Sequence, residues 1–203
     1  MSVAVVGISV AADPEPWASI GLQIDDDATW IGGIRLGFVD GASMQGVTGW
    51  TLAGSVEQAD TIDGLATSHV DSATMASESW DHPLGVRSFD HLVVMTSSLE
   101  RTCGAVAATT GAELRRVRDA GAVRQGFHRM GPIILEVVES ERVTQERSSF
   151  WGFVLIVDDL DAAVRRLGPE RIGPARDAVQ PGRRIASFRA SAGLGVPVAL
   201  MTG

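Results

Sequence analysis

Lysine, asparagine and tyrosine are missing from this chain of 203 residues, so all 17 of its basic residues are arginines. A chain without lysine has neither a Schiff-base lysine nor a phosphate-binding loop that depends on one. The single cysteine, Cys103, excludes an intramolecular disulfide. Because Cys103 belongs to an apolar stripe at helical spacing, we expect a core residue and not a reactive thiol.

Long apolar runs are also missing, and no basic stretch precedes an apolar one at the N-terminus. We therefore expect a cytoplasmic protein without a membrane partner. Positive charge is scarce, since 25 acidic residues give a formal net charge of −8. Binding to nucleic acid requires a basic face, so no nucleic-acid partner is expected.

The charge is divided unevenly along the chain. Residues 1–86 contain one arginine and 12 acidic residues, a net charge of −11, whereas residues 87–203 contain 16 arginines and 13 acidic residues, a net charge of +3. Such a step predicts two units with different surfaces. We interpret residues 1–86 as an accessory acidic module with a connection, and residues 87–203 as a second domain.

Short runs of valine, isoleucine and leucine, each ended by glycine, proline or aspartate, predict many β-strands. Helices are expected after Asp13, Ser97 and Asp158, where a capping residue precedes an apolar stripe, and Ser97 with Glu100 forms a capping-box pattern. Residues 55–86 predict a long connection, with or without a short helix. The expected strands are Val3–Val10, Thr29–Val39, Val47–Leu52, Phe89–Met95, Ile133–Val138, Phe153–Val157, Arg184–Arg189 and Val196–Met201.

The sequence contains an internal repeat. Residues 89–99 (FDHLVVMTSSL) and 150–160 (FWGFVLIVDDL) share a phenylalanine, a β run, a polar capping residue and the leucine that opens a helix. Each then reaches a glycine and closes with an apolar strand, which predicts βαβββ units over residues 87–145 and 146–203. The predicted fold class is α+β, with paired βαβββ modules and an N-terminal degenerate β-rich module.

Alternation along the strands assigns side chains to the two faces of a sheet. Leu92 and Val94 share an apolar face that suits packing against the helix, so His91 points to the other face. By the same alternation, Glu136 in the closing strand points to that other face too. The two side chains are expected in the cleft between the units, where such a pair can bind a metal or act as acid and base.

On these residues the chain resembles the vicinal oxygen chelate superfamily, which includes glyoxalase I, bleomycin-resistance proteins, fosfomycin-resistance enzymes and extradiol dioxygenases. The resemblance covers residues 87–203 and rests on the segments FDHLVV (89–94), LEVV (135–138) and VDDLDAA (157–163). It implies a cleft that binds a small oxygenated molecule. It also implies one divalent metal ion (zinc, nickel, iron or manganese), with His91 and Glu136 at two of the ligand positions.

The second unit departs from this family pattern, because the positions that match His91 and Glu136 are Gly152 and about Ala199. Catalytic metal sites usually have about three protein ligands and an open position. The cofactor expectation is therefore one divalent metal ion or none. A third ligand could come from the first unit, from the N-terminal part or from a second subunit, and the candidates within the chain are His128, His69 and His82.

Four further residues are expected to line the cleft and contact the ligand: Arg124, Gln125, Phe127 and Trp151. Arg124 precedes Gln125 and Phe127 in a strand expected to line the cleft, and a guanidinium can bind a carboxylate or phosphate. Trp151 adjoins the empty ligand position at Gly152, and its alternative role is that of a core or interface anchor.

Two functions remain open at this point. The first is a glyoxalase-like enzyme (a lyase, isomerase or dioxygenase) in which Glu136 and His91 hold a metal or act as acid and base. The second is a non-catalytic, metal-free protein that binds a small molecule, as bleomycin-resistance proteins do. A structural or partner-binding module is a third class, favoured if the chain's own side chains fill the cleft. The sequence leaves open whether the cleft closes within one chain or between the subunits of a homodimer.

Overall fold

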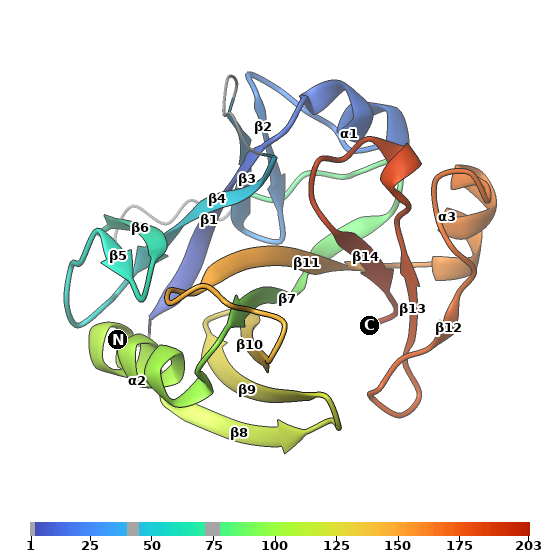
Figure 1. The fold of residues 1–203 in the computed structure, drawn as a ribbon. Coiled ribbons are helices and arrows are strands. Elements are labelled where there is room, and N and C mark those ends of the chain that lie inside the picture. Colours follow the sequence, from blue (N-terminus) through green and yellow to red (C-terminus); the bar gives the residue numbers. More distant parts are fainter. Residues whose placement is uncertain (1–2, 40–44, 72–77) are drawn as a thin grey trace. The chain divides into compact units, whose positions relative to one another are not determined.

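The computed structural model describes residues 3–39, 45–71 and 78–203 (Figure 1). The internal contacts of the chain divide it into two units. Unit 1 consists of Met1–Ile8, Thr48–Ala76 and His91–Trp151, and unit 2 of Ser9–Val47, Ser77–Asp90 and Gly152–Gly203. Each unit combines segments from both sides of residue 86, and separate domains over residues 1–86 and 87–203 remain a prediction.

The described residues form mainly β-strands with the helices α1, α2 and α3, so the predicted α+β class is confirmed. In chain order the elements are β1 (Ala4–Ala11), α1 (Pro14–Ile20), β2 (Ala28–Ile31), β3 (Ile34–Phe38), β4 (Gly46–Ala53), β5 (Thr61–Ile62), β6 (Leu65–Val70), β7 (Val86–Thr96), α2 (Leu99–Thr110), β8 (Leu114–Asp119), β9 (Val123–Met130), β10 (Ile133–Ser140), β11 (Ser149–Val157), α3 (Leu160–Leu167), β12 (Arg176–Asp177), β13 (Arg184–Ser187), a 3₁₀ helix (Ala190–Ala192) and β14 (Val198–Met201).

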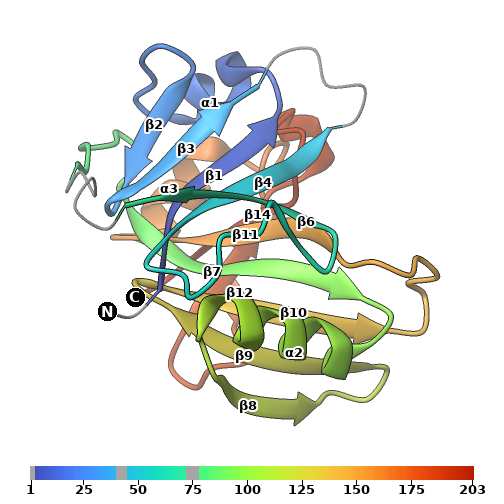
Figure 2. The ribbon, with the colours of Figure 1, turned by 90° about the vertical axis from the view of Figure 1, so that its left-hand side faces the viewer.

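In unit 1, β7, α2, β8, β9 and β10 form a βαβββ module. The strand order is β8-β9-β10-β7, in which β10 is parallel to β7 and antiparallel to β9. Helix α2 packs on β9 and β10 and lies along one face of this sheet (Figure 2). The alternate residues Leu92, Val94, Leu135 and Val137 are fully buried, as predicted for the strand positions that face the helix.

In unit 2, β11, α3, β12, β13 and β14 repeat this connectivity. The strand order is β12-β13-β14-β11, and β14 is parallel to β11 as β10 is to β7. The predicted pair of βαβββ modules is therefore confirmed. The same strand patterning in the two repeats leads to the same module, because the helix and the strand that follows it must return to one sheet.

The N-terminal segments form shorter versions of this module. Strands β1, β2 and β3 with helix α1 make a βαββ segment with the strand order β2-β3-β1, and β4, β5 and β6 make a helix-free segment with the order β4-β6-β5. Strands β4 and β6 are parallel, like the first and last strands of a full module. The predicted strand over Thr29–Val39 is a hairpin, because the chain turns at Gly32 and Gly33, which both have positive φ.

The connection predicted over residues 55–86 contains a short hairpin of β5 and β6. Asp63 and Gly64 form its turn with φ values of 49° and 96°, the left-handed geometry that suits a two-residue hairpin loop. The short helix considered for this connection does not form in its described residues, and residues 72–77 lie outside the described part of the chain.

Aromatic side chains from distant parts of the sequence form a core in unit 2. Trp17 on α1 is fully buried, and its ring centroid lies 5.5 Å from that of Phe38 and 6.0 Å from that of Phe153. The Trp17 indole Nε1 donates a hydrogen bond to the carbonyl of Leu194 at 3.1 Å. The acidic N-terminal segment thus supplies a buried anchor for the C-terminal module, and is more than a solvated extension.

The start of α2 differs from the predicted capping box. Ser98, not Ser97, is the N-cap, and its hydroxyl accepts a hydrogen bond from the Arg101 amide at 3.3 Å. The Leu99 amide donates to the carboxylate of Glu139 on β10 at 2.9 Å. Ser97 is not available because its hydroxyl donates to the carbonyl of Gln145.

None of the helices that the structure describes is long and apolar enough to cross a membrane.

Candidate functional site

His91 on β7 and Glu136 on β10 lie on the sheet face that points away from α2. The orientation follows from register, because Val137 pairs with Gly126, where an added Cβ would lie 2.8 Å from the Cys103 sulfur on α2. Glu136, one residue earlier, must then point to the other face. Its Oε2 lies 3.4 Å from His91 Nε2, and the two side chains are only 14% and 13% exposed. The structure therefore brings this predicted pair together.

Gln125 on β9 extends the pair to a group of three polar side chains. Its Nε2 donates a hydrogen bond to Glu136 Oε1 at 2.5 Å. Its Oε1 is buried and has no hydrogen-bond partner among the described residues. A buried acceptor without a donor is rare in proteins, so this atom marks a position that a ligand or water can satisfy.

Apolar side chains surround these polar groups. Phe127 pairs directly with Glu136 on β9 and is half-buried, and Val93 pairs with Glu136 on β7. Val93 and Val138, on the same face, are 7% and 8% exposed. The face thus offers one carboxylate, one imidazole and one amide in an apolar frame, which is the usual composition of a site for a small molecule.

The structure does not bring His128 to this face. His128 alternates with Phe127, is 1% exposed, and contacts the Ala112 carbonyl through Nδ1 at 2.9 Å. Burial lowers the pKa of its imidazole below the usual value of 6.5, and the second nitrogen, Nε2, has no partner among the described residues. It is a core histidine on the α2 side of the sheet and cannot join His91 and Glu136 at one metal ion.

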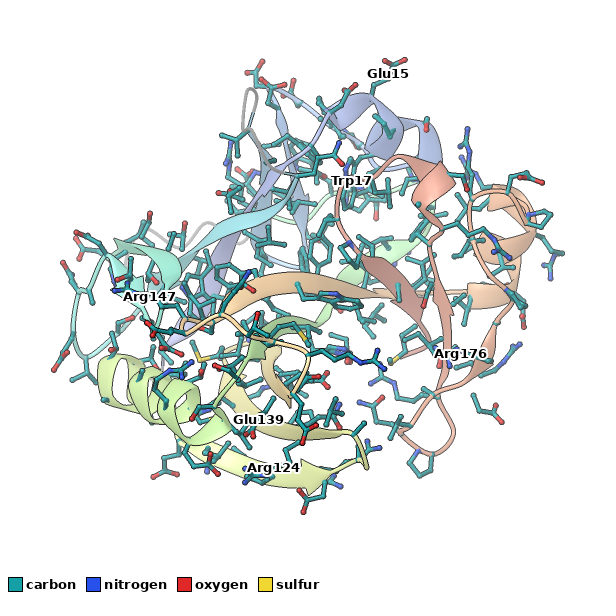
Figure 3. The ribbon with its side chains drawn as sticks, in the orientation of Figure 1. Glu15, Trp17, Arg124, Glu139, Arg147 and Arg176 are labelled. Atoms are coloured by element: carbon teal, nitrogen blue, oxygen red, sulfur yellow. The ribbon has the colours of Figure 1, made fainter. Side chains whose placement is uncertain are left out.

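Arg124 is also absent from the candidate face. Its guanidinium pairs with Glu139 at 3.2 Å and with Glu100 on α2 at 2.8 Å (Figure 3). It therefore joins β9 to the start of α2, where Glu139 also binds a helix amide. Trp151 on β11 is 53% exposed, and its contact with a ligand remains a prediction.

The second repeat has a different surface at the matching positions. Val154 pairs with Ala199 in unit 2 as Val93 pairs with Glu136 in unit 1, so Ala199 is the counterpart of Glu136. At Gly152, the counterpart of His91, an added Cβ would lie 2.2 Å from the Pro197 carbonyl oxygen. No side chain fits there without movement of the backbone. Ala199 packs in a buried apolar cluster with Val154 and Met201, against which three further residues pack: Ile156, Ala178 and Ile185.

The donors present do not fit a catalytic metal centre. His91 and Glu136 are suitable ligands, but about three protein ligands are usual. No group of three His, Cys, Asp or Glu side chains in the described ranges is placed to hold a metal ion. The histidines considered from the N-terminal part have backbone partners instead: His69 Nε2 contacts the Ala59 carbonyl, and His82 contacts the Trp30 carbonyl and the Gln23 amide.

Two polar clusters were not found from the sequence. In unit 2, Asp90 and Arg183 form a largely buried ion pair at 2.8 Å, although Arg183 follows a Pro-Gly turn that suggests a solvated side chain. In unit 1, the Asp63 carboxylate binds Arg101 and Thr102. The Asp63-Gly64 dipeptide is a hairpin signal that could have located the second cluster, but no local signal joins residues 90 and 183.

The comparisons with known proteins bear on the fold. No protein-family model and no curated protein matches the sequence. Among solved structures, a mutant of 4-hydroxymandelate synthase from Streptomyces coelicolor is similar with a TM-score of 0.63 at 11% identity, and the match covers 98% of this chain and 92% of that chain. Methylmalonyl-CoA epimerase from Mycobacterium tuberculosis is similar with a TM-score of 0.49 at 18% identity, over 58% of this chain and 89% of that one.

A methylmalonyl-CoA epimerase variant from Streptomyces coelicolor, in complex with 2-nitronate-propionyl-CoA, matches over 57% of this chain and 96% of that chain, with 21% identity and a TM-score of 0.46. At these identities the likeness concerns the fold and not the reaction. The synthase match runs along nearly the whole chain and so includes the shortened N-terminal segments. With its repeated βαβββ modules, the chain has the fold of the vicinal oxygen chelate (glyoxalase-like) superfamily.

Proposed function

We propose that this protein is a glyoxalase-like enzyme that binds a small oxygenated molecule at the His91–Glu136 face and transfers a proton without a metal ion. The observation that carries this proposal is the 3.4 Å approach of His91 Nε2 to Glu136 Oε2, with both side chains largely shielded from water. A positioned carboxylate or imidazole can accelerate proton transfer by about a hundredfold or more.

In this mechanism Glu136 acts as the base and His91 as its acid partner. The Glu136 carboxylate takes a proton from a carbon beside a carbonyl group, and the His91 imidazole donates its N–H proton to the carbonyl oxygen as negative charge develops there. The Gln125 amide, bonded to Glu136 Oε1, orients the carboxylate. Return of the proton to either carbon face, or loss of a leaving group, makes the reaction an isomerisation or an elimination.

The donor set favours this chemistry over that of a dioxygenase. Activation of oxygen generally needs a redox metal with about three protein ligands, and His91 and Glu136 are the two His, Cys, Asp or Glu side chains that the described residues bring together at this face. The positions that could complete the set in the second repeat are Gly152 and Ala199. The metal-dependent form of the hypothesis is therefore the less favoured one.

A non-catalytic binding protein is the second candidate. The apolar cluster around Ala199 favours it, because one of the two repeats offers no acid, base or ligand at the matching positions. Such a protein would hold its ligand by shape and burial, with His91, Glu136 and Gln125 providing hydrogen bonds. The expected homodimer and cytoplasmic location are separate proposals, and sedimentation and cell fractionation test them.

Proton exchange tests the enzymatic proposal directly. The full chain is incubated in D₂O with a panel of small 2-oxo acids, hydroxyketones and thioesters, and loss of the proton beside the carbonyl is followed by NMR. We expect exchange that Glu136→Gln and His91→Ala reduce by about a hundredfold or more. Glu141→Gln, an exposed change in the loop after β10, is the matched control and keeps full activity.

Metal dependence is tested in the same assay. Exchange should survive treatment with a chelator, and calorimetric titration with Zn²⁺, Ni²⁺, Fe²⁺ and Mn²⁺ should show no tight site. A tight site that His91→Ala removes, together with activity restored by one ion, contradicts the metal-free mechanism. Binding of a compound that needs Glu136 without any exchange supports the binding protein instead.

A further inference from the structure

A polar cavity of about 670 Å³, widely open to solvent, lies in unit 1. Cavities of a few hundred cubic ångströms are typical of small-molecule sites. Its walls come from the β5–β6 turn, the first turn of α2 with the residue before its cap, and the loop between β10 and β11. The residues that line it in the described part of the chain are all polar, charged or glycine: Thr61, Asp63, Gly64, Ser97, Arg101, Thr144, Gln145, Glu146 and Arg147.

Asp63 holds these three walls together. Its side chain is 8% exposed, and its carboxylate accepts hydrogen bonds from Arg101 Nε at 2.9 Å and from the Thr102 hydroxyl at 2.5 Å. Its carbonyl accepts hydrogen bonds from the amide and the hydroxyl of Ser148. Each carboxylate oxygen thus accepts one hydrogen bond from α2, and Arg101 compensates the charge within the wall.

Arg101 is held rigidly at this cavity. Its Nη2 donates to the Thr96 hydroxyl at 3.1 Å, in addition to the bond from Nε to Asp63. A guanidinium has further N–H groups in a fixed plane, so Arg101 keeps donors available after these two contacts. A cation that is already ordered loses little entropy when it binds a ligand.

Arg147 also lines the cavity, and it forms no ion pair with an acid in the part of the chain that the structure describes. Its aliphatic stem lies over the β5–β6 turn, because a Cβ added at Gly64 would come within 2.7 Å of Arg147 Cβ and 3.4 Å of its Cδ. Figure 3 shows Arg147 beside the hairpin, above the start of α2. The absence of a side chain at Gly64 therefore lets Arg147 pack against the turn, at the edge of the cavity that it lines.

We propose that this cavity binds a small hydrophilic molecule through a carboxylate or phosphate group, held by Arg147 and Arg101. Both guanidinium groups can make paired hydrogen bonds to such an oxyanion. The hydroxyls of Thr61 and Thr144 are further polar groups for the remainder of the ligand. None of the residues that line this cavity belongs to the His91–Glu136 face, so the site is additional to the proposed function and does not depend on it.

Glu146 allows a test in which two substitutions should change the anion affinity in opposite directions. This exposed acid also lines the cavity, and its negative charge opposes the binding of an anion. Removal of Glu146 and removal of Arg147 should therefore change affinity in opposite directions. Arg142 lies in the same loop, is equally exposed, and is not part of the lining, so Arg142→Gln controls for the general effect of net charge.

Calorimetric titration of the full chain with inorganic phosphate and with succinate provides the measurement. We expect at least one of these anions to bind, and the tighter of the two identifies the ligand group. Arg147→Gln should weaken binding by about tenfold, the loss of one charged hydrogen-bonding group. Glu146→Gln should tighten it severalfold, and Arg142→Gln should change it less than about twofold, as for distant exposed charges in salt.

Several results would overturn the proposal. They are the absence of binding by the unmodified chain at millimolar anion, an unchanged affinity in Arg147→Gln, and an equal loss in Arg142→Gln and Arg147→Gln. Thermal unfolding of each variant verifies that it remains folded. His91→Ala and Glu136→Gln should leave anion binding unchanged, which separates this site from the proton-transfer proposal.

Discussion

The two βαβββ repeats have the same strand order and the same parallel register, yet their matching surfaces differ in chemistry. Where unit 1 has Glu136 next to Val93, unit 2 has Ala199 next to Val154. Where unit 1 has His91, unit 2 has Gly152 against the Pro197 carbonyl. The module depends on alternate apolar residues that pack on its helix, and so tolerates either surface. The candidate chemistry depends on a few residues that do not determine the fold.

Exchange of residues at the counterpart positions should have the largest effect. Ala199→Glu places a carboxylate in an apolar cluster without a partner, and we expect a loss of about 3–5 kcal/mol in the free energy of unfolding. Glu136→Ala removes a side chain that is 14% exposed and leaves the Gln125 amide without its acceptor, so it should lose less, about 1–3 kcal/mol. Urea unfolding measures both. Equal losses would mean that the two faces are not different environments.

A methyl group at Gly152 should have the next largest effect. The new Cβ of Gly152→Ala would lie 2.2 Å from the Pro197 oxygen, and the backbone shift that relieves this contact should destabilise the protein by about 2–3 kcal/mol. The matched control is Gly104→Ala on α2, where no atom lies within 4 Å. Because alanine favours a helix, this control should stabilise by about 0.5–1 kcal/mol. Stability of Gly152→Ala equal to the unmodified chain would refute the close packing.

The buried histidine on the α2 side of the unit 1 sheet should make stability depend on pH. Burial lowers the pKa of His128 below 6.5, so the unfolded chain takes up a proton at a higher pH than the folded chain. Stability should therefore fall as the pH is lowered below about 6.5, by about 1.4 kcal/mol for each unit by which the pKa is lowered. His82 in unit 2 has its pKa lowered by burial too and adds to this slope.

The variant His128→Leu separates the contributions of His128 and His82 to the pH dependence of stability. It should remove the His128 part of the slope between pH 7 and pH 5 and leave the His82 part. Thermal unfolding at several pH values makes the measurement, with His69→Gln as a control on a partly exposed histidine of the same unit. A slope that His128→Leu leaves unchanged would rule out His128 as a source.

Removal of the N-cap residues of α2 and α3 should give the smallest difference in stability between the two repeats. In α3 the Asp159 carboxylate accepts a hydrogen bond from the Ala162 amide at 2.8 Å, whereas in α2 the Ser98 contact is longer and Glu139 supports a neighbouring amide. Loss of a capping side chain typically costs about 1 kcal/mol. We expect about that loss in Asp159→Ala and about half of it in Ser98→Ala, measured by urea unfolding. The reverse order would show that Glu139 does not share the capping of α2.

Much of the fold was predictable from local patterns. The repeat of FDHLVVMTSSL and FWGFVLIVDDL located both modules, and the apolar phase of Leu92 and Val94 placed His91 on the face opposite the helix. The same phase in β10 placed Glu136 on that face too, and the register of β10 with β7 in the structure brings the two side chains together. The cysteine was also predictable, since burial on α2 raises the pKa of the Cys103 thiol to about 11, which is typical of an unreactive core residue.

The phase of β9 was not predictable in this way. Neither alternate set of its residues is apolar. Val123, Gln125 and Phe127 lie on one face of the strand, and Arg124, Gly126 and His128 lie on the other. The structure assigns the second set to α2 because the missing side chain of Gly126 makes room for Cys103 and Leu99. For this reason Arg124 and His128 lie away from the candidate site, while Gln125 and Phe127 lie within it.

The sequence by itself determined the repeated module and the common sheet face of His91 and Glu136, because period-two alternation and one apolar phase are local properties of the chain. Only the tertiary structure decided which residues surround that pair, that Gly152 is closed by Pro197, and that Asp63 joins a hairpin, a helix and a loop around a polar cavity. These features depend on contacts between residues distant in sequence, which local sequence patterns do not predict.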